Sequence, residues 1–220
     1  MAITLGSTGL VFPDATTQTS KFDTGNDTGG FISIQVWTSS GTWTKPTGCR
    51  TVRVLVQGAG GGGSGHSESG GAGGYCERTF DVSGLSTVAV TVGTGGGGSN
   101  YAAGAGAGGT SSFGSYATSP GGAGANTVWG HTGGRGGLGA GGDINLYGGG
   151  GSAHGGQGTG KGGVSFFSGG HMPAGHHGGT FYTHWGESYG PVGSGGNGEY
   201  TTHSRGGNGR DGMVVVYNYS

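Results

Sequence analysis

Charged residues are scarce in this sequence. Its 220 residues include nine Lys and Arg and ten Asp and Glu, which gives a net charge of −1. Nucleic-acid-binding and membrane-surface proteins present clusters of Lys and Arg, and no such cluster occurs here. No apolar run approaches the ~20 residues of a membrane span, and residues 1–5 lack the features of a secretory signal. We therefore expect neither nucleic-acid binding nor membrane insertion.

Cysteine and proline are also rare. The five prolines, together with the absence of a Gly-X-Y period, exclude collagen. Cys49 and Cys76 could form one disulfide. Each lies near the start of an expected strand, and antiparallel pairing of those strands would place the two residues at opposite ends. We therefore favour two free, buried thiols over a disulfide.

Glycine is abundant, by contrast. Of the 64 glycines, seven precede residue 58 and none follows residue 212, so residues 58–212 form a glycine-rich body. Each Gly in a helix interior costs about 1 kcal/mol relative to Ala, which excludes a helical body. Disorder is the obvious alternative, because ordering Gly costs more backbone entropy than ordering any other residue.

β-branched and aromatic runs next to and inside the body argue against disorder. They occupy residues 49–57, 75–82, 87–92 and 213–219, and each is bounded by glycine or follows it closely. Such runs are typical of strands. The continuous apolar stretch Val214–Val216 indicates a strand that is buried on both faces. Because this strand follows the whole body, the body has to return to the earlier strands, and we expect it to be folded.

Two arrangements would let so much glycine pack. Extended polyproline-II-like segments can approach closely enough for weak Cα–H···O contacts and backbone hydrogen bonds. Alternatively, long ordered Gly loops could lie over a β-sandwich. The sequence leaves both open, and the predicted fold is all-β: a glycine-rich, β-sandwich-like head with long ordered Gly loops or packed polyglycine-II segments.

An extended N-terminal segment precedes this head. Residues 1–30 contain two short extended pieces joined by a turn, and they are too short and polar to bury a core alone. Residues 31–37 then alternate as a strand. We expect two units, an N-terminal segment at residues 1–37 and an all-β head at residues 38–220.

Two patterns in the sequence carry a family resemblance. Residues 10–19, Leu-Val-Phe-Pro-Asp-Ala-Thr-Thr-Gln-Thr, are similar to an element of bacteriophage tail-fibre proteins. Residues 38–46, Thr-Ser-Ser-Gly-Thr-Trp-Thr-Lys-Pro, and the closing Gly-Arg-Asp-Gly at residues 209–212 resemble the two ends of the glycine-rich domain of phage tail proteins.

The resemblance implies a virion protein of the phage tail, either a tail fibre or a tail tip. It further implies a homotrimer that attaches to other tail or baseplate proteins through residues 1–37. The head would then bind a bacterial surface receptor, either a glycan or an outer-membrane protein.

Catalytic, metal and phosphate motifs are weak. Residues 155–161 imitate a phosphate-binding loop, but Gly162 stands where Ser or Thr should bind Mg²⁺, and the two Arg-Gly-Gly triplets lack the charge for RNA. The His cluster lacks metal-ligand spacing, so surface histidines are the favoured interpretation. Its members are His171, His176, His177 and His184. No paired carboxylates or nucleophile context occurs, and we expect no enzyme activity, metal or cofactor.

Aromatic residues on glycine-flanked stretches are the candidate receptor-binding groups. Rings on such loops can stack on sugars or fill receptor pockets. The competing interpretation makes them small apolar caps that hold the body together. The predicted binding residues are Phe181, Tyr182, His184, Trp185 and Tyr189, with Trp129, His131 and Tyr147 as a second patch. The predicted function is host-receptor binding by a tail-fibre adhesin; the alternative is a structural virion component that touches no receptor.

Overall fold

The strands that the sequence predicts belong to two antiparallel sheets. The computed structural model describes residues 30–65, 67–100, 103–126, 132–153, 160–168, 190–198 and 205–220, and the backbone of three short strands nearer the N-terminus. Across these residues there is no helix. The all-β prediction is confirmed.

The larger sheet has five strands in the order β11-β7-β6-β12-β4, and every pair is antiparallel. Its strands are β4 (Phe31–Trp37), β6 (Thr51–Gln57), β7 (Tyr75–Asp81), β11 (Ile144–Leu146) and β12 (Met213–Tyr219). The last strand of the chain lies between β6 and β4, so the glycine-rich body does return to the strands that precede it.

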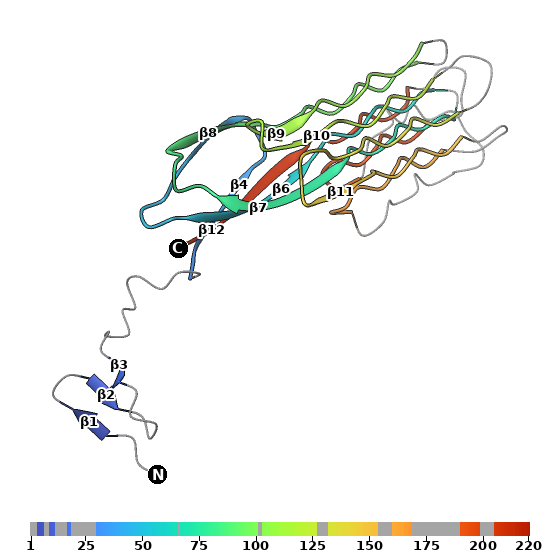
Figure 1. Cartoon of the computed structure of the whole chain (residues 1–220). Helices are drawn as coiled ribbons and strands as arrows, with labels where there is room; N and C mark the ends of the chain where they lie inside the picture. The colour runs from blue at the N-terminus through green and yellow to red at the C-terminus, as the bar shows by residue number, and fades with distance from the viewer. Residues whose placement is uncertain are drawn as a thin grey trace.

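The smaller sheet has four strands in the order β10-β9-β8-β5, also antiparallel. Its strands are β5 (Gly41–Thr44), β8 (Thr87–Thr91), β9 (Ser111–Phe113) and β10 (Ala117–Ser119). The two sheets pack face to face at one end of the head (Figure 1), over a core that is mainly valine and aromatic side chains.

Trp43, within the Gly-Thr-Trp-Thr-Lys-Pro stretch, lies at the centre of this core. Its side chain is fully buried and meets the Phe113 ring edge-on at 5.6 Å between centroids. Its Nε1–H donates to Oδ1 of buried Asn218 at 3.0 Å, so the indole's polar atom is satisfied. The Asn218 amide in turn donates to the carbonyl of Ser33. This chain of hydrogen bonds joins β5, β12 and β4 across the sandwich.

The expected domain boundary at residue 37 is wrong in one respect. Residues 31–37 are β4, which pairs with β12 from Val214↔Trp37 to Tyr219↔Phe31. They therefore belong to the head, which begins near residue 30. The N-terminal strands β1 (Thr4–Gly6), β2 (Gly9–Val11) and β3 (Thr17–Gln18) form a separate three-stranded antiparallel sheet.

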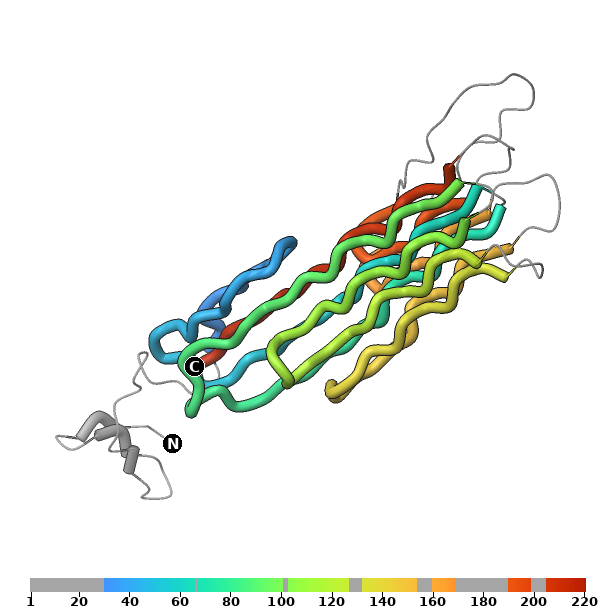
Figure 2. The backbone as a smooth tube through the Cα atoms, turned by 90° about the horizontal axis from the view of Figure 1, so that it is seen from above, coloured from blue at the N-terminus to red at the C-terminus, as the bar shows by residue number. Residues whose placement is uncertain are grey.

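The glycine-rich body is built from extensions of the sandwich strands. Figure 2 shows these extensions running side by side away from the sandwich as long wavy segments. The β6–β7 pair shows the principle: Gln57 pairs with Tyr75 at the end of the sheet, and the chain beyond it stays paired through Gly58 and Gly74. The described extension segments are residues 58–65, 67–74, 93–100, 103–109, 120–126, 132–138, 148–153, 160–164, 192–198 and 205–212.

The backbone hydrogen bonds of these segments repeat every three residues. In the segment 58–63, successive N–H groups donate in rotation to three different neighbouring segments. Gly58 and Gly61 donate to Gly74 and Gly71, Ala59 and Gly62 to Gly109 and Gly106, and Gly60 and Gly63 to Arg210 and Gly207. A β-strand alternates between two sides, whereas a helix with three residues per turn and no internal hydrogen bonds bonds outward in three directions. The body is therefore a packed array of polyglycine-II segments, one of the two expected arrangements.

The array requires glycine at many positions because the backbones of neighbouring segments approach closely, and not because the residues there adopt unusual dihedral angles. A Cβ added at Gly108 would lie 2.3 Å from the carbonyl oxygen of Ala59, and one at Gly136 would lie 1.8 Å from that of Gly148. Neither glycine has a positive φ. Side chains are absent at these positions because the backbone of the next segment occupies the space.

The centre of the array is consequently a core of backbone. Residues 58–65, 67–74 and 193–198 are buried wherever the structure describes them. Gln57 ties this core to the sandwich: its buried Nε2 donates to the carbonyls of Gly73 at 2.9 Å and Gly74 at 3.0 Å.

Replacing a touching glycine with alanine should destabilise the head. We predict that Gly108→Ala and Gly136→Ala lower the free energy of unfolding by about 1–3 kcal/mol each, the usual cost of overpacking. In a domain of this size 1 kcal/mol corresponds to about 2–4 °C in Tm, which thermal unfolding followed by circular dichroism resolves.

Gly150→Ala is the matched control, because a Cβ at this exposed body position meets nothing closer than the carbonyl oxygen of Gly134 at 3.7 Å. Its Tm should stay within about 1 °C of the parent, since surface substitutions usually change stability by less than 0.5 kcal/mol. Equal Tm values for all three variants would contradict a close-packed array.

The two cysteines are free and buried, as expected. Cys49 precedes β6, whereas Cys76 pairs with Val56 near the other end of the same strand. Burial raises the pKa of both thiols, which lowers the fraction of reactive thiolate.

We predict that neither thiol reacts with a maleimide in the native protein and that both react once the protein unfolds in denaturant. Mass spectrometry of the quenched reaction counts the labels. Ala89→Cys, on the exposed face of β8, supplies a positive control that should label within the native state. Rapid native labelling of Cys49 or Cys76 would show that the sandwich opens readily.

Candidate binding surfaces

Several strand extensions end together at the end of the body farthest from the sandwich (Figure 2). Ser99 links three of them there, because its carbonyl accepts from the N–H groups of Gly65 and Gly206, both at 2.9 Å. A fourth joins through Ala125, whose N–H donates to the carbonyl of Gly62 at 2.9 Å. This far end is therefore a fixed platform from which connecting stretches leave and return.

The stretch 169–189 is anchored elsewhere. Ser165, just before it, donates through Oγ to the carbonyl of Val192, just after it. Gly193 N–H donates to the carbonyl of Asp211 at 2.8 Å, two residues before β12 begins. Gly193 also has φ +73° and lies against Gln57 at the junction between body and sandwich. Both ends of the stretch are thus held beside the sandwich.

Most of the predicted receptor-binding residues lie outside the described residues. Phe181, Tyr182, His184, Trp185 and Tyr189 belong to the stretch 169–189, and Trp129 and His131 to the stretch 127–131. Their role stays a prediction. Tyr147 is described, and the residue is 73% exposed. It follows β11 and forms a bridge with Leu138 at the sandwich end of the body. The body segment 132–138 runs to Leu138 from the far end, so Tyr147 lies at the opposite end of that segment from residue 132.

An aromatic cluster that the predicted set omits lies next to the anchor of residues 169–189. Phe166 stacks on Tyr75 with ring centroids 3.8 Å apart, and Phe167 meets Tyr75 edge-on at 5.9 Å. Tyr75 is almost fully buried, but Phe166 is 55% exposed. The sequence signal for this cluster was the adjacent pair Phe166-Phe167 in a glycine-rich region. Its partner Tyr75 lies some ninety residues earlier, so the sequence did not indicate the contact.

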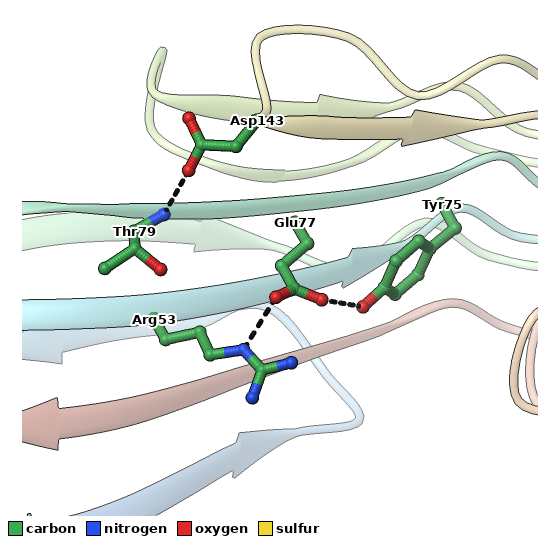
Figure 3. Close-up of polar contacts among 5 residues, drawn as sticks. All are labelled: Arg53, Tyr75, Glu77, Thr79 and Asp143. Atoms are coloured by element: carbon green, nitrogen blue, oxygen red, sulfur yellow. Dashed lines mark hydrogen bonds and ion pairs between the residues drawn. The ribbon is translucent and has the colours of Figure 1, made fainter.

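A polar bridge lies beside this cluster on the same sheet face (Figure 3). Arg53 Nε donates to Glu77 Oε1 at 2.7 Å, and the Tyr75 hydroxyl donates to Glu77 Oε2 at 2.8 Å. The hydrogen bond from Arg53 lowers the pKa of Glu77. Burial raises the pKa of Tyr75, so its hydroxyl stays protonated and donates. Glu77 is therefore a carboxylate held by two donors.

Asp143 accepts a backbone hydrogen bond at the edge of the same sheet. Its Oδ2 accepts the backbone N–H of Thr79 at 2.8 Å, as Figure 3 also shows. β11 pairs with β7 only along residues 75–77. Asp143 thus satisfies an N–H that lies beyond the end of that pairing.

The outer face of the five-stranded sheet, which points away from the four-stranded sheet, is apolar along β4 and β12, whereas β7 contributes the polar residues Glu77, Thr79 and Asp81. The register places Val215 and Tyr217 of β12 on this face opposite Leu55 and Arg53 of β6. The β4 register adds Phe31, Ile34 and Val36. The exposed apolar residues on or beside the outer face are Phe31 at 59%, Ile34 at 48%, Val36 at 56%, Ile144 at 46%, Leu146 at 41% and Phe166 at 55%.

Among the described residues, no group of three or more His, Cys, Asp or Glu side chains is placed to hold a metal ion. Within the same residues, no helix is long and apolar enough to cross a membrane. What the described surfaces offer instead is exposed aromatic and aliphatic area around one neutralised ion pair.

The Glu77 bridge should make stability depend on pH. A carboxylate whose folded pKa is lowered contributes stability above its unfolded pKa and loses that contribution as pH falls through the folded value. We predict that the free energy of unfolding falls as the pH drops below the ordinary pKa of a glutamate, about 4.3, and that Glu77→Gln reduces this fall. The Arg53 side chain is 46% exposed, so the pair contributes less than about 1 kcal/mol.

Chemical denaturation at several pH values measures the effect, with Arg53→Leu and the double variant completing a thermodynamic cycle. Asp81, whose pKa is lowered by the backbone N–H of Ser83, should retain its own part of the acid slope in every variant. An unchanged slope in Glu77→Gln would show that the bridge carries no coupling energy.

Comparison with known proteins agrees with the architecture. A glycine-rich domain family matches residues 36–219, which is nearly the whole head. Among curated proteins no match to the chain was found. Since the family match spans well over half of the sequence, the chain belongs to the glycine-rich domain family.

Proposed function

We propose that this protein is a receptor-binding adhesin of a phage tail fibre or tail tip. In this proposal the rigid glycine-rich head presents aromatic-bearing loops to a bacterial surface glycan or outer-membrane protein. Residues 1–30 join three copies and attach them to other tail proteins. The finding that supports the proposal most is the backbone-cored body, because it holds both ends of the candidate loops on a fixed frame.

A fixed frame favours recognition for an energetic reason. Binding residues concentrate on loops that a rigid scaffold positions, and a loop whose ends are already held loses less entropy on binding. The stretch 127–131 lies between two body segments, one ending at residue 126 and the other beginning at residue 132. The stretch 169–189 is flanked by residues 168 and 190, close to the hydrogen bond between Ser165 and Val192. The stretches between them carry seven of the eight predicted binding residues.

The loop chemistry fits a sugar or protein surface better than a small charged ligand. Phe181, Tyr182 and Trp185 provide ring faces, and His184 lies between them as a directional hydrogen-bonding group. The glycines at 178, 179 and 186 permit tight turns on both sides. The net charge of −1 argues against recognition by long-range electrostatics.

A structural role without receptor contact is the second candidate. The large apolar outer face favours it, because this surface suits packing within an assembly. The two roles differ in one measurable respect: an adhesin adsorbs to host cells as a purified protein, and a structural component does not.

The test is a cell-adsorption assay with the purified full chain and two variants. We expect Trp185→Ala and Tyr182→Ala to weaken adsorption by about 2 kcal/mol per site, roughly 30-fold, if each ring is an interface hot spot. Their Tm should change little. Thr91→Ala, on the exposed face of β8, is the control and should adsorb like the parent.

The opposite pattern would identify these rings as part of the apolar core. In that case the variants would lose Tm while their folded fraction adsorbed normally, and Tyr147 with Trp129 and His131 would become the next residues to test. A parent protein that adsorbs to no cells would instead favour the structural role.

A further inference from the structure

One aromatic ring is exposed where the body meets the outer face of the five-stranded sheet. Phe166 stacks on the buried ring of Tyr75, with centroids 3.8 Å apart and planes 16° apart. Phe167 lies 5.9 Å from Tyr75 and 5.4 Å from Phe166, and it is nearly perpendicular to both. These similar distances place Phe167 beside the stack and not on top of it. The face of Phe166 that is turned away from Tyr75 is therefore free of both rings, in a residue that is 55% exposed.

The surrounding contacts hold this ring in place. Tyr75 beneath it is fixed by burial and by the hydrogen bond from its hydroxyl to Glu77. Ser165, the residue before Phe166, donates through Oγ to the carbonyl of Val192. A ring that is already ordered loses little conformational entropy when a ligand binds. Phe166 is thus a preformed surface on which the C–H face of a sugar can stack.

Polar side chains continue from this ring along β7. Glu77, Thr79 and Asp81 occupy every second position on the outer face, about 7 Å apart. Thr79 and Asp81 are exposed, and β6 adds Arg53 directly opposite Thr79. These four residues form the polar strip. The strip begins next to the ring, because the Tyr75 hydroxyl donates to Glu77 Oε2 at 2.8 Å (Figure 3).

The polar strip retains unused hydrogen-bonding capacity. Arg53 donates through Nε to Glu77, and among the described residues its two Nη groups find no acceptor. Each oxygen of Glu77 accepts one hydrogen bond and can accept another. Donors and acceptors therefore lie side by side. A hydroxyl group suits such a surface, because it can donate and accept at the same time.

We propose that the polar strip and the free face of Phe166 form a binding site for a neutral glycan chain. One sugar unit stacks on Phe166, and the following units lie along β7 with hydroxyls that pair with Arg53, Glu77 and Thr79. The site is separate from the candidate aromatic residues of the stretch 169–189. The choice of a glycan as ligand rests on the proposed adhesin function.

Charge favours a neutral glycan over an acidic one. The guanidinium of Arg53 is already held by the Glu77 carboxylate at 2.7 Å. At the other end of the strip, Asp81 lies within the field of Lys45 and Arg50. The carboxylate of an acidic sugar would compete with Glu77 for Arg53 and would lie close to a charge of its own sign. Neutral hydroxyls avoid this repulsion, and their binding depends little on ionic strength.

A glycan microarray tests the site with the full-length protein. The array carries bacterial surface glycans, both neutral and acidic. We expect binding to neutral members, with a signal that changes by less than about twofold between low and high salt. Titration calorimetry with one bound neutral oligosaccharide then gives the affinity of each variant.

Two substitutions test the ring and the strip separately. Phe166→Ala removes the stacking surface and should weaken binding by about tenfold, whereas Phe166→Trp keeps a ring face and should bind nearly as well as the parent. Thr79→Val removes an exposed hydroxyl at nearly constant volume and should weaken binding by about fivefold. Phe31→Ala is the matched control, because Phe31 is a similarly exposed ring on the same sheet face but on the edge strand β4. All these positions are exposed, so the variants should keep the circular dichroism spectrum of the parent.

Three outcomes would overturn the inference. They are absence of binding to every neutral glycan, neutral binding that Phe166→Ala and Thr79→Val leave unchanged, and a salt-sensitive preference for acidic glycans. Cell adsorption on the same samples tests the proposed function separately. Adsorption that depends on Trp185 but not on Phe166 would keep the adhesin and remove this site, whereas Phe166-dependent glycan binding by a protein that adsorbs to no cells would do the reverse.

Discussion

Hydrogen bonding between glycine backbones is the constraint on which the rest of this structure depends. In the body, a segment such as residues 58–63 donates to three neighbours in rotation. Each bond contributes only about 1 kcal/mol net, while ordering glycine costs more entropy than ordering any other residue. No segment can therefore be stable alone. The array forms only if its members are brought together in register, and the sandwich does this by fixing the strands from which the segments extend.

The junction between sandwich and body explains two of the sequence patterns. Asp211 in the closing Gly-Arg-Asp-Gly accepts the N–H of Gly95 at 2.7 Å through Oδ1, which joins two body segments just before β12 begins. A Cβ on Gly212 would lie 2.4 Å from the carbonyl oxygen of Gln57, so only glycine fits there. Residues 209–212 thus lie where the backbone changes from the three-residue repeat of the body to the two-residue repeat of the β-sheet. Gln57 lies at the corresponding change on β6.

The pattern of side chains determined how much of the fold and of the candidate site could be predicted from the sequence. The strands at residues 51–57 and 213–219 follow from β-branched alternation and apolar runs, and the need for β12 to find partners indicated a folded body. Glycine has no side chain to mark a face, so the sequence could not separate packed segments from loops or say which segments touch. The short strands β5, β9, β10 and β11 were not predicted, since three or four residues carry too little pattern. β4 was recognised as a strand but assigned to the wrong unit, because its partner lies at the far end of the chain. The candidate loops were found from their aromatics, whereas the Tyr75–Phe166 stack depends on a contact between distant residues.

The same constraint separates the head into regions with different freedom to change. Where backbones touch, as at Gly108 and Gly136, any side chain collides with a carbonyl, so the array interior can hold little chemical variety. Diversity is confined to the connecting stretches and to the outward faces of the sandwich. The described segments on either side of a stretch such as residues 127–131 are held by hydrogen bonds of their own, as at Ala123 and Ala125. On the outer face of the five-stranded sheet the requirement differs, because Ile34 and Val36 are costly to expose. The freedom to accept side chains therefore differs between the array interior and the rest of the head, and this difference follows from a body whose core is its own backbone.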